Sequence, residues 1–312
     1  MTERFAAIDV GTNTVLLLVA ERRGDGFAPV AERAEITRLG RGVDRAGALD
    51  GAAIRETVEV LAAYAAEARA LGARAIACVA TSAARDARNA ADFFEAARAA
   101  AGVRPEVIGG EEEARLVWAS AWRDFGAAGG GAPLSVLDVG GGSTEFTWGD
   151  GPAPRGRLSL QVGAVRLAER HPAPDPPGAA GLAVLRAAAA EALGPLAGAG
   201  SARAGARLVG VAGTVTTLAA VEQALPAYDA GRVHGAALSL DRIEGLLARL
   251  AALPVEARRR LPGMEPKRAD VILAGGAVVA EAMRATGFGT LTVSDRGVRW
   301  GLLWDRFGGG AR

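Results

Sequence analysis

Asp9–Thr14 reads DVGTNT, and Asp138–Thr144 reads DVGGGST. Each stretch follows a short apolar run and places a carboxylate, then glycine, then hydroxyl-bearing residues at the end of a predicted strand. Glycine lets the backbone approach a ligand closely, and successive backbone N–H groups form a concavity that binds anions. The aspartate can hold a cation that neutralises the anion, most simply Mg²⁺. Two matched copies therefore predict a two-sided phosphate clamp with Mg²⁺ as its cofactor.

A third turn has the same character. Residues 211–217 read VAGTVTT, an apolar strand that runs into glycine and then into a hydroxyl-rich helix start, which is a ready anion site. The alternative for the two loops is a duplication that no longer binds a ligand. The residues expected to contact substrate are Asp9, Gly11, Thr12, Asn13, Thr14, Gly140, Gly141, Gly142, Ser143, Thr144, Gly213 and Thr214.

Length and composition limit the class of protein. A chain of 312 residues is long for one hydrophobic core and natural for two domains. The formal net charge of +1 gives no global basic field, so neither nucleic acid nor a membrane is expected as a partner. Cys78 is the only cysteine and lies in an apolar run, which excludes an internal disulfide and favours the cytoplasm.

The order of predicted elements indicates an α/β fold. The first half is predicted as β-β-β-α-β-α-β-α, and the second half restarts with strands around the second loop. Residues 126–133 (GAAGGGAP) are the best boundary, which gives domains 1–130 and 131–312. Ligands of such sheets bind beyond the carboxyl ends of the strands. We therefore expect a cleft between two similar domains, with both aspartate–glycine loops in it.

Two further stretches could carry chemistry. Residues 107–116 (VIGGEEEARL) place three carboxylates at a strand-to-helix junction, where they either favour the helix dipole or supply a general base for water attack on phosphorus. Residues 81–85 (TSAAR) are predicted to begin a helix with Thr81 or Ser82 as the capping hydroxyl, or to donate hydrogen bonds at the rim of the cleft. Spacing alone leaves these alternatives open.

Taken together, the motifs resemble the exopolyphosphatase/guanosine pentaphosphate phosphohydrolase (Ppx/GppA) family, within the actin, hexokinase and heat-shock ATPase (ASKHA) superfamily. The loops belong to the whole superfamily, whereas the TSAAR and EEARL stretches single out this family from the kinases. The stretches that carry the resemblance are residues 7–14, 81–85, 112–116, 138–145 and 294–297. The resemblance implies two related ASKHA-type α/β domains with an interdomain cleft.

The resemblance also implies roles for individual residues. Glu113 matches the catalytic base, next to Glu112, and Arg85 matches an arginine that reaches the phosphates. Asp138 matches the residue associated with the divalent metal, and Glu145 matches an acidic residue near it. The implied activity is Mg²⁺-dependent release of the terminal phosphate of inorganic polyphosphate, or conversion of guanosine pentaphosphate to tetraphosphate. A homodimer stays open.

The chain also departs from the family pattern. The His-Asp phosphohydrolase domain of longer family members is expected to be absent, Gly109 replaces a serine, and Trp300 stands where an acidic residue is more usual. Two other functions account for the loops. An ATP-dependent small-molecule kinase leaves the EEARL stretch unexplained, and a non-catalytic sensor of guanosine tetra- or pentaphosphate needs no base.

Overall fold

The computed structural model describes residues 2–126, 132–199 and 206–309, and these residues form two compact units. Unit 1 contains the described residues up to Leu116 together with those from Val298 onward, and unit 2 extends from Val117 to Gly297. The chain therefore passes between the units twice. The sequence predicts a single boundary at residue 130/131, within a stretch that lies outside the described residues.

Unit 1 is built on a five-stranded sheet in the order β3-β2-β1-β4-β5. β1, β2 and β3 are antiparallel neighbours, whereas β4 is parallel to β1 and β5 is parallel to β4. The elements that begin in unit 1 are β1 (Arg4–Val10), β2 (Thr14–Arg23), β3 (Gly26–Ile36), α1 (Val43–Ala46), α2 (Gly51–Ala70), β4 (Ala73–Ala80), α3 (Ser82–Asp86), α4 (Ala90–Ala101), β5 (Glu106–Val107) and α5 (Gly110–Ala121).

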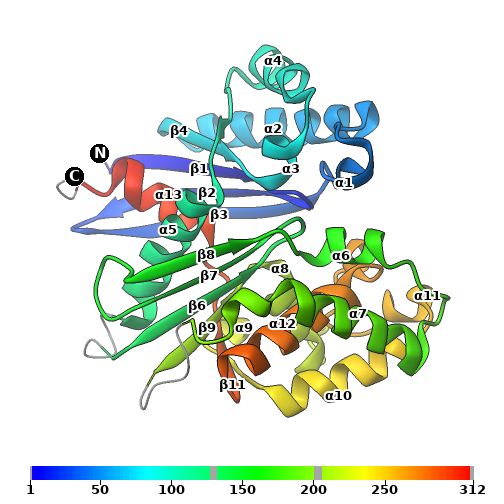
Figure 1. Ribbon diagram of the computed structural model, residues 1–312. Helices are drawn as coiled ribbons and strands as arrows, with labels where there is room; N and C mark the ends of the chain where they lie inside the picture. The colour runs from blue at the N-terminus through cyan, green and yellow to red at the C-terminus, as the bar shows by residue number, and fades with distance from the viewer. Residues whose placement is uncertain (1, 127–131, 200–205, 310–312) are drawn as a thin grey trace. The chain divides into compact units, whose positions relative to one another are not determined.

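The alternation of side chains along β1 decides which face carries the loop aspartate. Ala6, Ile8 and Val10 are buried in the core that α2 and α4 share with the sheet. Phe5 points to the opposite face and stacks on Phe307 of α13 (Val298–Phe307), with ring centroids 4.6 Å apart. Figure 1 shows α2 and α13 on opposite faces of this sheet. Because alternate residues of a strand share a face, Asp9 lies on the α13 side of the sheet, away from the main core.

Unit 2 is built on a six-stranded sheet in the order β10-β11-β9-β6-β7-β8. β6, β7 and β8 are antiparallel neighbours, β9 is parallel to β6, β11 is parallel to β9, and β10 is antiparallel to β11. Its elements are β6 (Leu134–Val139), β7 (Thr144–Gly149), β8 (Gly156–Leu160), α6 (Ala164–Arg170), α7 (Gly178–Ala192), β9 (Arg207–Val211), α8 (Ala212–Glu222), α9 (Ala230–Val233), β10 (Ala237–Ser239), α10 (Leu240–Ala251), α11 (Val255–Arg258), α12 (Ile272–Thr286) and β11 (Thr290–Val293).

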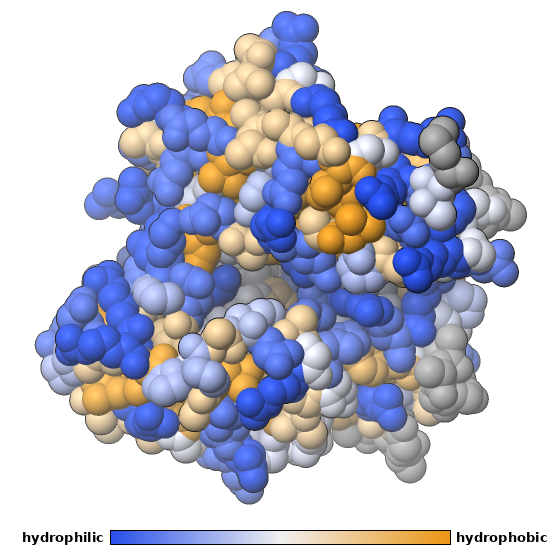
Figure 2. Space-filling model, turned by 180° about the vertical axis from the view of Figure 1, so that it is seen from behind, coloured by the Kyte–Doolittle hydropathy of each residue, from blue (hydrophilic) through white to orange (hydrophobic). Residues whose placement is uncertain are grey.

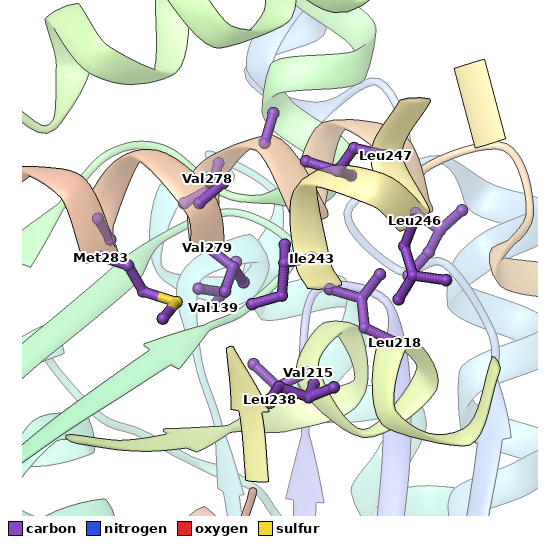
Figure 3. Packing of buried hydrophobic residues seen from close by; sticks show 14 of the residues in the cluster. Val139, Val215, Leu218, Leu238, Ile243, Leu246, Leu247, Val278, Val279 and Met283 are labelled. Atoms are coloured by element: carbon purple, nitrogen blue, oxygen red, sulfur yellow. The ribbon is translucent and has the colours of Figure 1, made fainter. Parts of the chain in front are cut away.

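Helix α12 is the centre of the unit 2 core. It is buried on nearly every side, and its side chains pack with those of α8, α10 and β6 (Figure 3). Two of its residues are glycines because neighbouring helices approach closely. A methyl group on Gly275 would lie 2.7 Å from the Thr214 hydroxyl, and one on Gly276 would lie 2.5 Å from Leu247. The glycine pair in this helix thus serves packing.

The two sheets are duplicates of each other. Reading β8-β7-β6-β9-β11 against β3-β2-β1-β4-β5, each pair of neighbours has the same sense. Strand β10 is an addition at one edge of the second sheet. The prediction of two related α/β domains is therefore confirmed, and the two aspartate–glycine loops occupy equivalent β-hairpins.

The first passage between the units lies in helix α5 and the helical segment that continues it. The α-helical part ends at Ala121, and a π-helix follows over Trp122–Gly126. Leu116 in α5 lies against α13, where a methyl group on Gly301 would be 2.0 Å from the Leu116 carbonyl oxygen. Only glycine allows the two helices to approach so closely there.

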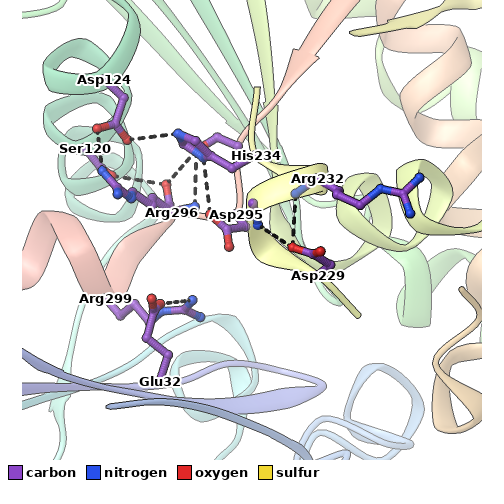
Figure 4. Close-up of polar contacts among 11 residues, drawn as sticks. Glu32, Ser120, Asp124, Asp229, Arg232, His234, Asp295, Arg296 and Arg299 are labelled. Atoms are coloured by element: carbon purple, nitrogen blue, oxygen red, sulfur yellow. Dashed lines mark hydrogen bonds and ion pairs between the residues drawn. The ribbon is translucent and has the colours of Figure 1, made fainter. Parts of the chain in front are cut away.

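The second passage begins at residues 294–297, and a polar cluster in unit 2 ties it to the first. The Ser120 hydroxyl donates to the Arg296 carbonyl oxygen (3.1 Å), and the Arg296 guanidinium donates to Asp124 (2.8 Å) (Figure 4). His234 Nδ1 lies 3.2 Å from an Asp295 carboxylate oxygen. Burial raises the pKa of Asp124, while Arg296 and His234 oppose that rise. Both chain passages are thus fastened together within unit 2.

The surface is mainly hydrophilic on the face drawn in Figure 2, where hydrophobic residues form only small groups. The large hydrophobic residues that are exposed in the described ranges are Val30, Val107, Val184 and Tyr228. Within those same ranges no helix combines the length and the apolar character needed to cross a membrane.

Candidate active site

The two predicted phosphate loops have the same internal geometry. In unit 1 the Gly11 N–H donates to the Thr14 carbonyl oxygen (3.0 Å), and in unit 2 the Gly140 N–H donates to the Ser143 carbonyl oxygen (3.1 Å). The loops close the β1–β2 and β6–β7 hairpins, and Thr12 and Asn13 are buried within the first of them. Each loop follows its buried aspartate, Asp9 or Asp138.

Arg85 and Glu113 meet in unit 1. The Arg85 guanidinium donates to the Ile108 carbonyl oxygen (3.2 Å), and its Nη1 lies 3.9 Å from Glu113 Oε2. The same guanidinium lies 3.6 Å from the carboxylate of Asp86. Helix α3 supplies the arginine and α5 supplies the glutamate, whose side chain is buried. A buried carboxylate beside a guanidinium is an arrangement suited to a phosphate substrate.

The three successive glutamates are not equivalent. Glu112 accepts two hydrogen bonds from Arg115 (2.6 and 2.7 Å), and Arg115 also donates to Asp305 (2.7 Å). These carboxylates raise the pKa of Arg115 above its already high ordinary value. Glu111 is exposed. Of the predicted catalytic carboxylates, Glu112 is thus engaged in a salt bridge, and Glu113 is the one held next to Arg85.

Asp138 and Glu145 are direct neighbours across two strands of unit 2. They face each other in the antiparallel register of β6 and β7, so their side chains lie on the same face of the sheet. Burial alone raises the pKa of Asp138 to about 6. Glu145 is also buried and accepts a hydrogen bond from the Ser159 hydroxyl (2.8 Å).

These two carboxylates fit a divalent cation. Like charges directly opposite on neighbouring strands repel each other, and a cation removes that penalty. The described residues contain no group of three or more His, Cys, Asp or Glu that could hold a metal. Mg²⁺ does not need one, because it is commonly bound by one or two carboxylates together with water and substrate phosphate oxygens.

The third turn has a strained backbone. Ala212, the first residue of α8, adopts φ +71°, a conformation that residues with a side chain rarely take. The space beside Gly213 is filled by the Arg268 guanidinium, which would lie 2.0–2.4 Å from a methyl group there. Burial lowers the pKa of Arg268. The turn thus combines a helix N-terminus with an arginine, both of which favour an anion.

Sequence reasoning missed Arg268. The residue lies in a short 3₁₀ segment, Pro266–Arg268, far along the chain from the turn that it touches. No local motif marks it, and only the fold brings it to Gly213. The one available signal was the glycine itself, because a glycine that opens a helix indicates that another group approaches its backbone closely.

Three of the predicted hydroxyl-bearing residues have structural surroundings that the sequence does not reveal. The Thr144 hydroxyl donates to the Val162 carbonyl oxygen (2.6 Å), so it fastens the second loop to the chain beyond β8. Thr214 is 2% exposed and packs against Gly275 of α12. Thr81 is the N-cap residue of α3, yet its hydroxyl makes no capping hydrogen bond. Loop anchoring thus engages the Thr144 hydroxyl, and helix packing surrounds Thr214.

The remaining predicted residues belong to two half-sites, one in each unit. Asp9, the first loop, Arg85 and Glu113 are in unit 1. Asp138, the second loop, Glu145 and Gly213 are in unit 2. The expectation that both half-sites line one cleft stays a prediction.

The fold and these half-sites define a class. A duplicated α/β fold with an aspartate–glycine hairpin loop in each copy is the ASKHA type, and carboxylates with arginine beside the loops indicate phosphate chemistry. The profile of the Ppx/GppA phosphatase family matches residues 18–308, and the chain belongs to this family.

Individual relatives agree with this assignment. Exopolyphosphatase 2 of Mycobacterium tuberculosis is 38% identical over 96% of this chain and 97% of its own length. Exopolyphosphatase 1 of Mycobacterium leprae is 32% identical over 96% of this chain and 88% of its own. The crystal structure of the Aquifex aeolicus Ppx/GppA family member is 32% identical, with a TM-score of 0.81 over 98% of this chain and 97% of that one. A solved exopolyphosphatase-like protein is 31% identical, with a TM-score of 0.88 over 97% of each chain.

Proposed function

We propose that the protein is an exopolyphosphatase that releases the terminal phosphate of inorganic polyphosphate, with guanosine pentaphosphate as a second substrate. The observation that carries this proposal is the buried Glu113–Arg85 pair in a chain whose relatives are named exopolyphosphatases. A phosphohydrolase needs a proton acceptor for water and cationic groups for the phosphates. The pair supplies one of each.

In the proposed reaction, Glu113 accepts a proton from water as the water oxygen bonds to the terminal phosphorus. The bridging phosphorus–oxygen bond breaks, and the shortened chain leaves with the bridging oxygen. Arg85 offsets negative charge on the transferred group, and the loop N–H groups hold the chain end. Catalysis of this kind is mainly positioning and charge stabilisation. The proposal requires both half-sites to reach one phosphate chain.

We also propose that Asp138 and Glu145 hold Mg²⁺. Their opposed positions in the β6–β7 register and the raised pKa of buried Asp138 support this assignment. Bound there, Mg²⁺ would neutralise negative charge on phosphate oxygens. Arg268 would add a second positive group beside Gly213 and so help to hold the phosphates further along the chain.

The two competing functions have less support. A kinase of the same superfamily is not favoured by membership of a phosphatase family. A non-catalytic sensor would have no use for Glu113 and its arginine partner. The buried, lone Cys78 supports a cytoplasmic location, and a homodimer stays a prediction that light scattering can check.

The decisive experiment measures release of orthophosphate from short polyphosphate, long polyphosphate and guanosine pentaphosphate, each with and without Mg²⁺. We expect Mg²⁺-dependent release from polyphosphate without any sugar acceptor. Release that requires ATP and an acceptor would support the kinase instead. Binding of guanosine pentaphosphate with no turnover of any substrate would support the sensor.

A further inference from the structure

The start of α6 holds the carbonyl groups of the second loop. The Ala164 N–H donates to the Gly140 carbonyl oxygen (2.9 Å). The Val165 and Arg166 N–H groups both donate to the Gly141 carbonyl oxygen (2.9 and 3.1 Å). These bonds turn two successive loop carbonyls towards α6.

The next carbonyl is held by a side chain. Arg166 Nε donates to the Gly142 carbonyl oxygen at 2.7 Å. In a planar trans peptide, the N–H of the following residue points opposite to the carbonyl. The N–H of Ser143 therefore points away from α6, in line with those of Gly141 and Gly142. Successive N–H groups on one side form an anion-binding concavity.

The first loop shows why this bond matters. Its equivalent of Gly142 is Asn13, whose carbonyl oxygen accepts backbone N–H groups from Thr37 (3.1 Å) and Arg38 (3.0 Å). The backbone alone fixes that peptide, and Arg38 adopts a strained φ of +54° to do so. The peptide after Gly142 has no such backbone donors in the described structure, and glycine lets it rotate at little cost.

Gly163 shows how closely α6 approaches the loop. A methyl group on Gly163 would lie 2.6 Å from the carbonyl carbon and oxygen of Gly141. Its backbone is extended (φ −155°), so glycine is required for space and not for conformation. Any side chain there would push the start of α6, and Arg166 with it, away from the loop.

We propose that Arg166 is a positioning residue that sets the direction of the Ser143 N–H towards bound phosphate. The guanidinium acts through the Gly142 carbonyl group, and Gly163 provides the close approach that this bond needs. The inference rests on the proposed function, because it takes the second loop to be a phosphate site. It concerns how that loop is held, which the loop sequence does not reveal.

The test compares Arg166→Met, Arg166→Lys and Gly163→Ala with tripolyphosphate as substrate. Methionine keeps the stem and removes the donor, and we expect KM to rise about tenfold, the effect of one charge-assisted hydrogen bond, with kcat changed less than threefold. Lysine retains a donor for the Gly142 carbonyl and should recover most of the lost affinity. Gly163→Ala should raise KM to a similar extent.

The double variant separates positioning from direct contact with substrate. If Arg166 acts through the loop, Gly163→Ala and Arg166→Met disturb the same peptide, and their effects on KM will be far from additive. Additive effects, or an unchanged KM in Arg166→Met, would overturn the inference. Arg170→Gln, at the exposed end of the same helix, is the matched control for loss of charge and should leave KM unchanged.

A parallel binding measurement keeps the two proposals apart. Calorimetric titration with tripolyphosphate reports the affinity of the wild type and of Arg166→Met without any turnover. A wild type that binds tripolyphosphate but releases no orthophosphate would contradict the proposed function, while the affinity ratio would still decide the role of Arg166. Equal affinities in the two proteins would overturn the inference even if the enzyme is active.

Discussion

The two sheets share a topology, yet the helices that follow their fifth strands, α5 and α13, carry different residues at equivalent positions. Glu113 and Arg299 occupy equivalent positions. Glu113 follows the end of β5 at Val107 by the same number of residues as Arg299 follows the end of β11 at Val293. Glu113 is held near Arg85, whereas Arg299 donates to Glu32 at 2.7 Å. One copy of the duplicated helix start thus carries the carboxylate that we propose as proton acceptor, and the other carries a cation engaged in a structural ion pair. The duplication supplies two scaffolds, and divergence at equivalent positions gives them different chemistry.

The loop aspartates differ in the same way. Asp138 faces Glu145 across its hairpin, while Asp9 faces the apolar Leu16. A pair of opposed carboxylates suits a divalent cation better than a single carboxylate does, because it supplies two ligands and more negative charge. Under the proposed function, unit 1 provides the base and unit 2 provides the metal ligands.

The largest expected effect tests the Glu113 side of this comparison. Glu113→Gln keeps the shape of the side chain and removes its ability to accept a proton. General-base catalysis contributes about 10²–10⁴-fold, so we expect kcat for polyphosphate hydrolysis to fall by that factor while substrate still binds. Glu111→Gln, at an exposed position in the first turn of the same helix, should change kcat little. If Glu113→Gln keeps most of its kcat, Glu113 is not a proton acceptor that distinguishes α5 from α13.

The next test contrasts the two loop aspartates. Asp138→Asn should raise the Mg²⁺ concentration needed for half-maximal activity by at least the 10–100-fold that loss of an outer-shell metal partner costs. Asp9→Asn should leave that concentration unchanged, because Asp9 has no carboxylate opposite it. Mg²⁺ titrations of phosphate release measure both. Identical Mg²⁺ dependence in the two variants would remove the metal from unit 2.

A third test concerns the helices that carry the differing residues. Gly301→Ala places a methyl group against the Leu116 carbonyl, and overpacking of this kind costs about 1–3 kcal/mol of unfolding free energy. Gly245→Ala, at an exposed position of helix α10 with open space around it, should instead stabilise by roughly 0.5–1 kcal/mol. Urea unfolding measures the free energy of unfolding of both variants. A stabilised Gly301→Ala variant would show that α5 and α13 do not meet there.

The smallest effect concerns pH. Burial raises the pKa of Tyr64 in unit 1 to about 12 from its ordinary value of 10.0. A raised folded-state pKa gives stability that is complete below pH 10 and is lost as pH rises towards 12, which amounts to about 1 kcal/mol at pH 11. Tyr64→Phe should reduce the alkaline loss by that amount, whereas Tyr228→Phe, at an exposed site, should not. Urea unfolding at pH 8 and pH 11 measures this loss of unfolding free energy. Equal losses in Tyr64→Phe and Tyr228→Phe would contradict the prediction.

Much of the fold could be predicted because its signals are local. The aspartate–glycine loops mark strand ends, and the apolar runs around them mark the hairpins, so Asp9, Asp138 and the duplication follow from short stretches of sequence. The glutamate cluster was also visible, since three carboxylates follow a predicted strand. The preference for Glu113 came from family resemblance, and the structure adds that Glu112 is engaged with Arg115.

What the sequence could not show depends on contacts between distant segments. Arg268 reaches Gly213 from 55 positions along the chain, and Arg166 reaches the loop from a helix with no motif of its own. The place of α13 could not be predicted either, since this helix belongs to unit 1 and packs on the β1 side of its sheet through Phe307. Amphipathic helices of this kind do not specify in sequence which sheet they cover.

The discontinuity of unit 1 has a consequence for synthesis on the ribosome. Helix α13 is translated after every residue of unit 2, yet it covers Phe5 and Phe27, which are among the first residues made. At roughly 5–20 residues per second, the nascent chain keeps this aromatic face exposed for on the order of 10–40 s while unit 2 emerges and closes. The sheet of unit 1 is thus begun first and completed last, and its uncovered aromatic residues are the surface that a chaperone at the tunnel exit would meet.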